Sequence, residues 1–181
     1  KYLNEAREFG QIISKPVLSR FSNWSCEEEP KNLRIGLVSG DLKNHPVGFF
    51  LEGLLNQLGD SKIELYAYTT RLNSDDLTLR IKPNFARWSS LVGISDDLAA
   101  NYIHSDGIHI LIDLSGHTAH NRLKIFARKP APIQITWLGY FASTGVDEID
   151  YILGDPYVTP AMEADHFSEK IWQLPESYLC F

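Results

Sequence analysis

Short apolar runs alternate with amphipathic segments along most of this chain, and this alternation constrains the fold more than any other feature. Runs such as RIGLVS, KIELYAYT and IHILIDL are rich in Ile, Leu and Val, which is typical of strands buried on both faces of a parallel sheet. Between them, apolar residues recur at helical spacing, as in VGFFLEGLLNQL. The pattern predicts an α/β fold, a parallel sheet with helices on both faces.

The boundaries of these elements follow from the same pattern. We expect strands at 34–39, 62–69, 86–89, 108–114, 133–138 and 151–153, and helices at 2–13, 47–58, 75–82, 96–104 and 121–128, with a further helical piece at 163–167. Ser95 is a suitable N-cap for the helix that follows it.

The first 32 residues differ from the rest of the chain. The segment YLNEAREFGQII has helical spacing, and SNWSCEEEPKN is polar, charged and interrupted by proline. A helix this short is marginal by itself and needs something to pack against. We therefore expect residues 1–32 to be a linker helix with a polar connection, and residues 33–181 to form one domain, since 181 residues hardly suffice for two.

The charge of the chain argues against nucleic-acid binding. It has 17 Lys and Arg against 23 Asp and Glu, a net charge of −6, whereas nucleic-acid-binding domains are usually basic. A local basic cluster could still meet a phosphate, but the favoured interpretation is a solvated helix face. The cluster consists of Arg122, Lys124, Arg128 and Lys129.

The two cysteines, Cys26 and Cys180, lie near opposite ends and match no metal-binding spacing. A disulfide is possible but not required, which favours a reducing compartment. No apolar run is long enough for a membrane span, and the first residues do not form a signal peptide. These observations predict a cytoplasmic protein.

The bend after the first expected strand, SGDLKNHPVGFF, holds Asp41 four residues before His45. In a structural interpretation, Asp41 and Asn44 satisfy backbone donors of the turn, and Pro46 begins the helix. In a chemical interpretation, the histidine is a general acid or base that the carboxylate orients. The bend lacks the glycine fingerprints of dinucleotide and P-loop sites, which disfavours a nucleotide-dependent oxidoreductase.

A second stretch, DGIHILIDLSGHTAHNR, contains three histidines. His109 lies within an expected strand, and we interpret it as a buried, hydrogen-bonded residue. His117 and Thr118 should emerge at the carboxyl end of that strand, where Gly116 would let the backbone approach a ligand closely. His117 and His120 lack a Cys or acidic ligand at matching spacing, so no metal site is predicted.

The third stretch, PAPIQITWLGYFASTG, ends a strand in Leu138, Gly139 and Tyr140 and continues into a Ser/Thr-Gly loop. Such a loop offers free backbone N–H groups at the edge of the sheet. Three polar loops at one edge favour a ligand-binding cleft more than any one of them does.

Together, SGDLKNHPVGFFLEGLL, DGIHILIDLSGHTAHNRL and RKPAPIQITWLGYFASTG, followed by DYILGD and LPESYLCF, resemble one family from about Leu33 onward. This is the tetratricopeptide-linked glycosyltransferase family that contains the O-GlcNAc transferases and the SPINDLY O-fucosyltransferases. The resemblance implies the amino-terminal, Rossmann-like half of a GT-B glycosyltransferase, whose active site lies between two such halves. It also implies two partners: upstream tetratricopeptide repeats and a carboxyl-terminal catalytic half.

The resemblance further implies an inverting transferase that moves a sugar, with GlcNAc favoured, from a nucleotide diphosphate to Ser or Thr of an acceptor protein. The donor would be UDP-GlcNAc or GDP-fucose, and no cofactor is expected. The family motifs imply that His45 and Asp41 are catalytic, and that the substrate-binding residues are Pro46, His117, Thr118, Leu138, Gly139 and Tyr140.

Some residues depart from the O-GlcNAc transferase pattern. Val47, Gly48 and Phe49 follow the His-Pro pair, Phe141 follows Tyr140, and SGHTAHN is closer to SPINDLY. The alternatives are therefore an O-fucosyltransferase of SPINDLY type, or a non-catalytic sugar-nucleotide sensor or scaffold. Because the family's nucleotide-binding residues belong mostly to the other half, these 181 residues alone are expected to be inactive.

Overall fold

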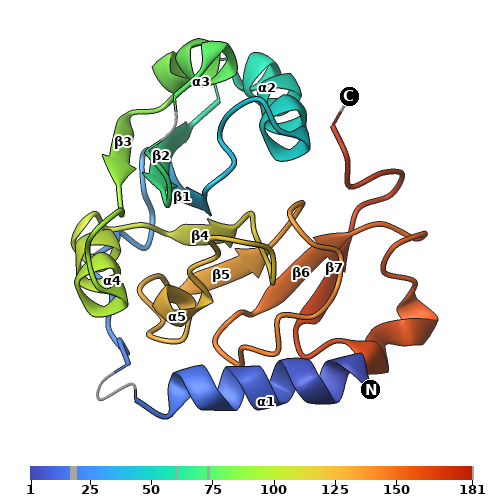
Figure 1. Cartoon of the computed structure of the whole chain (residues 1–181). Helices are drawn as coiled ribbons and strands as arrows, with labels where there is room; N and C mark the ends of the chain where they lie inside the picture. Colours follow the sequence, from blue (N-terminus) through green and yellow to red (C-terminus); the bar gives the residue numbers. More distant parts are fainter. Residues whose placement is uncertain (17–19, 60, 73, 181) are drawn as a thin grey trace.

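Parallel strands run through the centre of the molecule, which is described by a computed structural model over residues 1–16, 20–59, 61–72 and 74–180 (Figure 1). Within these residues they form one seven-stranded sheet in the order β3-β2-β1-β4-β5-β6-β7. Every neighbouring pair is parallel. The bounds are β1 Leu33–Ser39, β2 Ile63–Thr69, β3 Arg87–Ser90, β4 Ile110–Asp113, β5 Ile133–Thr136, β6 Tyr151–Gly154 and β7 Lys170–Gln173.

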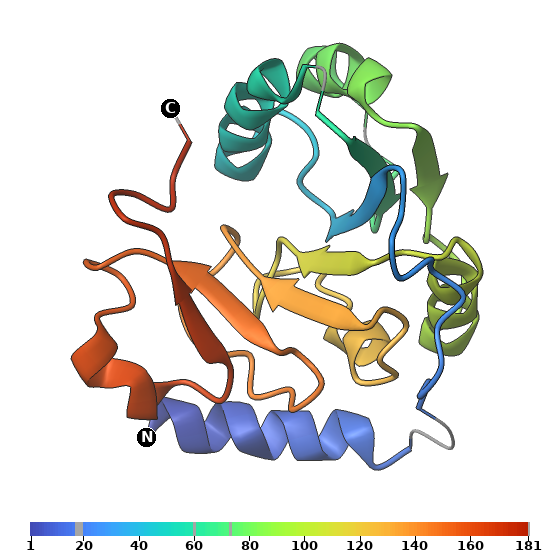
Figure 2. The same cartoon turned by 180° about the vertical axis from the view of Figure 1, so that it is seen from behind.

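Helices cover both faces of this sheet (Figures 1 and 2). Helices α2 and α3 enclose one core, which contains Leu37, Ala67 and Trp137. Helices α1, α4 and α5 lie on the opposite face, whose core contains Val38 and Leu111. The bounds are α1 Tyr2–Ser14, α2 Pro46–Leu58, α3 Asp76–Ile81, α4 Asp96–Ser105 and α5 Leu123–Phe126, with 3-10 helices η1 Lys82–Asn84 and η2 Ala161–His166.

The strand order reverses between β1 and β4. From β1 the chain builds outward through β2 to β3, and it then returns to β4 and continues in the other direction to β7. This is the doubly wound order of Rossmann-like folds, in which ligands bind outside the carboxyl ends of the strands where the order reverses. The predicted Rossmann-like α/β fold is confirmed.

Several predicted boundaries differ from the structure. The strand expected at 108–114 is limited to Ile110–Asp113, and the helix expected at 121–128 is limited to Leu123–Phe126. That helix begins late because Arg122 has a non-helical backbone conformation, with φ −132° and ψ 42°. After it, Arg128 and Lys129 donate to the carbonyl oxygens three residues earlier, and Lys129 turns the chain with a left-handed φ of 56°. Strand β7 has no counterpart among the predicted elements, because four residues reading KIWQ are too short to show a period.

Helix α1 packs directly on the α/β domain. Its residues Ala6, Gly10 and Ile13 are buried, and Ile13 belongs to the same core as Val146 and Ile149. The connection from β5 to β6 contains no helix in the described chain, and α1 lies beneath this part of the sheet (Figure 2). Residues from the start of the sequence thus cover a face that a crossover helix covers in other α/β units.

The basic cluster around α5 is structural, which corrects the expectation of a solvated face. Arg122 donates to Asp96 and to the carbonyl oxygens of Leu91 and Ile94. Arg128 pairs with Asp97, and Lys129 with Asp150. Only Lys124 of the four is exposed. The charges of Arg122, Arg128 and Lys129 are matched by carboxylates that lie far away in sequence, so no pairing is visible in the sequence pattern.

None of the described helices has the length and apolar character that crossing a membrane requires.

Candidate active site

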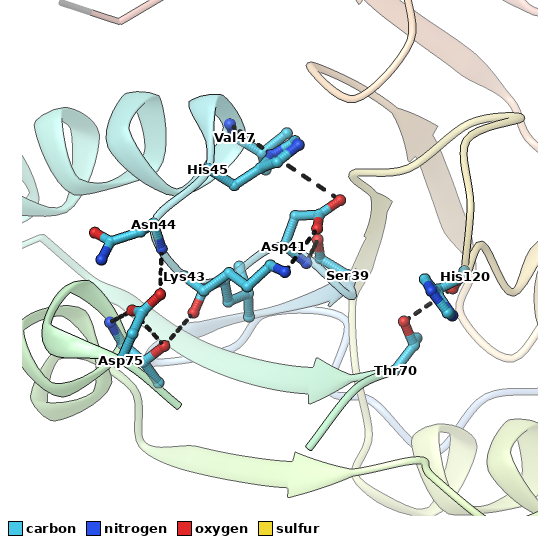
Figure 3. Close-up of polar contacts among 11 residues, drawn as sticks. Ser39, Asp41, Lys43, Asn44, His45, Val47, Thr70, Asp75 and His120 are labelled. Carbon is cyan, nitrogen blue, oxygen red and sulfur yellow. Dashed lines mark hydrogen bonds and ion pairs between the residues drawn. The ribbon is translucent and has the colours of Figure 1, made fainter. Parts of the chain in front are cut away.

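The turn between β1 and α2 carries the carboxylate of Asp41, which contacts the side chains of Lys43 and His45 but accepts no hydrogen bond from the described residues (Figure 3). The hydroxyl of Ser39 accepts a hydrogen bond of 2.9 Å from the backbone N–H of Asp41. The Asp41 carboxylate itself has two contacts in the described part of the chain, with Lys43 Nζ and His45 Nδ1, each at 3.9 Å. Asp41 and Lys43 are largely enclosed, with side chains 16% and 18% exposed. The Asp41 carboxylate is therefore mostly buried and can still accept a hydrogen bond or a proton.

His45 is the N-cap of α2. Its Nδ1 accepts a hydrogen bond of 3.3 Å from the backbone N–H of Val47, and Pro46 occupies the first turn of the helix. Because a backbone N–H can only donate, Nδ1 of the neutral ring is unprotonated and the proton lies on Nε2. The side chain is 42% exposed, so a ligand can approach the ring. His45 can thus cap the helix and still offer Nε2 to a ligand, but its unprotonated Nδ1, 3.9 Å from Asp41, does not donate to that carboxylate.

Helix α3 supports this turn from the side. Asp75, its N-cap, accepts hydrogen bonds from the backbone N–H groups of Asn44, at 2.7 Å, and Thr78, at 3.0 Å. The hydroxyl of Thr78 donates to the carbonyl oxygen of Leu42 at 2.8 Å. A Cβ added at Gly48 would overlap the carbonyl oxygen of Lys43, so α2 can approach the turn only with glycine there.

The loop after β4 is organised by a fully buried carboxylate. Asp113 accepts hydrogen bonds from the backbone N–H groups of Ser115, at 3.1 Å, and Gly116, at 2.7 Å, and from the hydroxyl of Thr136, at 3.0 Å. Burial raises the pKa of Asp113 to about 6 against the opposing effect of these hydrogen bonds. The acid therefore ties the start of the loop after β4 to the end of strand β5.

His117 and Thr118 do emerge after β4, both partly exposed. His117 Nε2 is 2.9 Å from the carbonyl oxygen of Thr144, and its ring meets the ring of Phe9 from α1 edge to face, with centroids 5.0 Å apart. The hydroxyl of Thr118 donates to the carbonyl oxygen of Ser115 at 2.7 Å. Both side chains thus have structural partners.

The loop after β5 packs closely on the loop after β4. Leu138 adopts a left-handed φ of 72°. A Cβ at Gly139 would overlap the carbonyl oxygen of Leu114, and a Cβ at Gly116 would lie 2.7 Å from Cβ of Tyr140. These two glycines allow the two loops to touch. Leu138, Gly139 and Tyr140 are all partly exposed beside them.

Two other sequence expectations concern histidines. His109 is buried as predicted: Nδ1 accepts from the backbone N–H of Arg34, and Nε2 lies 3.1 Å from the carbonyl oxygen of Glu27. His120 is exposed, and its carbonyl oxygen accepts from the hydroxyl of Thr70 at 2.9 Å. Among the described residues no group of three or more His, Cys, Asp or Glu side chains could hold a metal.

Sequence reasoning missed two residues of this region. Lys43 was inside the motif but had no assigned role, and its charge lies beside Asp41. Asp75 lies 31 residues from the turn that it supports; the sequence signal was its position before an expected helix. The predicted residues follow β1, β4 and β5, which are adjacent in the sheet, so the three motifs share one edge at the point where the strand order reverses.

A doubly wound sheet with polar loops at this edge defines the class: a Rossmann-like ligand-binding domain. Residues 8–180 match the family described as Glycosyl transferase family 41, and the chain belongs to this family.

Named relatives agree with this assignment. A probable UDP-N-acetylglucosamine–peptide N-acetylglucosaminyltransferase SPINDLY from Oryza sativa subsp. japonica is 35% identical, over 97% of this chain and 19% of that protein. A UDP-N-acetylglucosamine–peptide N-acetylglucosaminyltransferase from Caenorhabditis elegans is 34% identical, over 93% of this chain and 15% of that protein. The chain thus spans about a fifth or less of these relatives.

A solved structure also matches. It is a mutant O-GlcNAc transferase from Thermobaculum terrenum, with a TM-score of 0.90 and 35% identity, over 98% of this chain and 34% of that one. The expected resemblance to O-GlcNAc transferases and SPINDLY, and the expected fold of one half of such an enzyme, are confirmed.

Proposed function

We propose that this chain is the amino-terminal half of the catalytic region of an inverting protein O-glycosyltransferase. In the reaction, a Ser or Thr hydroxyl of an acceptor protein attacks the anomeric carbon of a nucleotide-diphosphate sugar. A new C–O bond forms on one side as the bond to the diphosphate breaks on the other. The hydroxyl loses its proton to a base, and the nucleoside diphosphate leaves. The family assignment and the glycosyltransferase names of the relatives support this proposal.

One observation carries the proposed chemistry: Asp41 and His45 lie in the turn after β1, at the edge where Rossmann-like folds bind ligands. The Asp41 carboxylate has no hydrogen bond among the described residues and can accept a proton, directly or through a water. His45 has its Nδ1 occupied by Val47, so it donates through Nε2. We assign proton acceptance to Asp41 and a hydrogen bond to the donor substrate to His45.

The loops after β4 and β5 would hold the sugar. Pro46, beside His45, lies on the same edge, and the partly exposed Leu138, Gly139 and Tyr140 offer two backbone N–H groups and an aromatic ring. His117 and Thr118 complete this group as binding candidates. The departing diphosphate gains charge and needs cationic or N–H partners. We expect these chiefly from residues outside this chain, so the 181 residues alone should not turn over.

The names of the relatives favour UDP-GlcNAc as the donor, and GDP-fucose is the alternative. The experiment incubates the full-length protein with each donor and follows release of the nucleoside diphosphate, with and without cell-extract protein. Protein-dependent release from one donor supports the proposal and identifies the sugar. Binding of a donor without release would instead indicate a sugar-nucleotide sensor or scaffold.

A matched pair of variants tests the assigned roles. Asp41→Asn should lower transfer by about 100-fold or more, the usual effect of removing an acid–base group. His45→Ala should lower transfer by about 10- to 100-fold, because it removes a hydrogen bond to the charged donor substrate. Asn44→Ala is the control, because this exposed side chain lies in the same turn while its backbone N–H keeps the bond to Asp75. Normal transfer by His45→Ala would remove the role assigned to that residue.

We also infer a cytoplasmic location and helical repeats upstream of these residues in the full-length protein, as the resemblance to tetratricopeptide-linked glycosyltransferases implies. Cys26 and Cys180 are free thiols in the structure. Fractionation of cells that express the tagged full-length protein tests the location.

A further inference from the structure

Helix α1 contacts the candidate sugar loops at the level of backbone atoms. Gly145 adopts a left-handed φ of 70°, and a Cβ there would overlap the backbone of Ala6. A Cβ at Gly10 would overlap the carbonyl oxygen of Gly145. Two glycines therefore allow the helix and the segment 143–145 to touch directly. Any shift of α1 must move this segment, because no side chain lies between them to absorb it.

Aromatic side chains of α1 extend the contact to both loops. The Tyr2 hydroxyl donates to the carbonyl oxygen of Ser143 at 3.1 Å. Its ring centroid lies 6.2 Å from that of Tyr140 and 6.3 Å from that of His117. Phe9 meets the His117 ring edge to face at 5.0 Å. One helix thus packs against one residue from each loop that we assign to sugar binding.

The far side of segment 143–145 is held by a buried acid. Glu169, directly before β7, accepts hydrogen bonds from the Ser143 hydroxyl, at 2.9 Å, and the Thr144 backbone N–H, at 2.7 Å. The carbonyl oxygen of Thr144 in turn contacts His117 Nε2. The segment is therefore enclosed between α1, Glu169 and the loop after β4, and only Phe141 and Ala142 separate it from Tyr140, which precedes it in the chain.

We propose that α1 is a positioning element for the donor site, with Tyr2, Phe9 and Gly10 as positioning residues. This inference rests on the proposed function. The helix sets where segment 143–145 lies, and this segment with Phe9 sets the positions of Tyr140 and His117. Helix α1 is then part of the catalytic apparatus of this chain, although none of its residues touches the reacting atoms.

The test uses the full-length protein and two independent measurements. Hydrogen exchange of residues 138–145 reports the order of the loop without any substrate. Steady-state kinetics with UDP-GlcNAc and GDP-fucose give the KM for the donor and kcat separately. The variants are Gly10→Ala, Phe9→Leu and Tyr2→Phe, with Phe9→Tyr as the conservative rescue. Gln11→Ala is the control, because Gln11 is exposed on the same helix turn.

Gly10→Ala is the most informative variant, because alanine favours a helix over glycine by about 1 kcal/mol. Any loss of loop order or donor affinity in this variant must therefore come from the contact with Gly145. We expect faster exchange in 138–145 and a donor KM raised by about 10- to 100-fold, as for a displacement on the order of 1 Å.

Phe9→Leu should raise the donor KM by about two- to tenfold, which corresponds to the loss of one aromatic pair. Tyr2→Phe should speed exchange at 143–145, whereas Phe9→Tyr and Gln11→Ala should match the wild type.

Unchanged exchange in both Gly10→Ala and Phe9→Leu overturns the positioning role. So does a loss of kcat that only follows a lower Tm, with the KM unchanged. If Gly10→Ala does not fold, the positioning role is judged from Phe9→Leu and from whether Phe9→Tyr keeps wild-type exchange and donor KM. If the wild type binds neither donor, the proposed function fails by that result alone, and the exchange measurement still decides whether α1 positions the loop.

Discussion

The carboxylate of Asp75 accepts a hydrogen bond of 2.7 Å from the backbone N–H of Asn44, so the N-cap of α3 also holds the turn that carries Asp41 and His45. The hydrogen bond from the Thr78 backbone is the largest cause that lowers the pKa of Asp75. A short helix and the candidate active site therefore share one acid.

Removing this acid should loosen the turn. An acid with a lowered pKa in the folded state stabilises the fold above its ordinary pKa of 3.8, and the effect is lost as the pH falls through the folded value. Asp75→Ala should therefore lower the Tm at neutral pH, and the difference from wild type should shrink below pH 3.8. Asp76→Ala, at an exposed neighbour, is the control. Thermal melts over this pH range check the prediction, and a difference that grows in acid would contradict it.

His45 serves both helix stability and the proposed chemistry, and two substitutions separate these roles. His45→Ala removes the N-cap acceptor and should cost about 1 kcal/mol of unfolding free energy. His45→Asn replaces the acceptor with another good N-cap and should keep most of this stability, while losing transfer as fully as the alanine variant. Denaturant unfolding and sugar transfer are measured on the same preparations. Recovery of transfer in His45→Asn would show that sugar transfer depends on the helix cap and not on the imidazole.

The buried Asp113 predicts a pH dependence of the opposite sign. Its pKa is raised to about 6 by burial, so between the ordinary value of 3.8 and about 6 the folded chain holds this proton more firmly than the unfolded chain. The stability of the wild type relative to Asp113→Asn should therefore fall by roughly 3 kcal/mol as the pH rises through this range, and stay level above it.

Denaturant unfolding at a series of pH values measures this difference. Asp147→Asn, at an exposed position, should leave the profile of the wild type unchanged. A relative stability that rises with pH would contradict the prediction, because it would mean that the folded state favours the charged carboxylate.

Arg122 binds two backbone carbonyl oxygens, of Leu91 and Ile94, and the carboxylate of Asp96. Arg122→Met keeps much of the side-chain volume but leaves these acceptors without their donors, which should cost about 2 kcal/mol. Lys124→Met, at the exposed member of the same cluster, should change the unfolding free energy by less than about 0.5 kcal/mol. Equal effects of the two changes would mean that the basic cluster is a solvated surface after all.

Local pattern by itself determined much of this protein. The apolar runs of β1, β2 and β4 and the helical spacing of α2 and α4 follow from burial, because a side chain repeats every two residues in a strand and about every 3.6 in a helix. Ser95 caps α4 as expected, accepting from Leu98. The motifs at Asp41 to Pro46 and Leu138 to Tyr140 were visible because polar residues and glycines interrupt apolar runs at strand ends.

Tertiary structure alone decided which distant residues meet. The order β3-β2-β1-β4-β5-β6-β7 brings three separate motifs to one edge. Asp96, Asp97 and Asp150 neutralise a basic cluster that looks unpaired in sequence. Strand β7, four residues long, is defined by its pairing with β6 and not by any period of its own. Helix α1 meets Gly145 more than 130 residues away. Contacts of this kind depend on packing between elements, and packing leaves no regular spacing in the sequence.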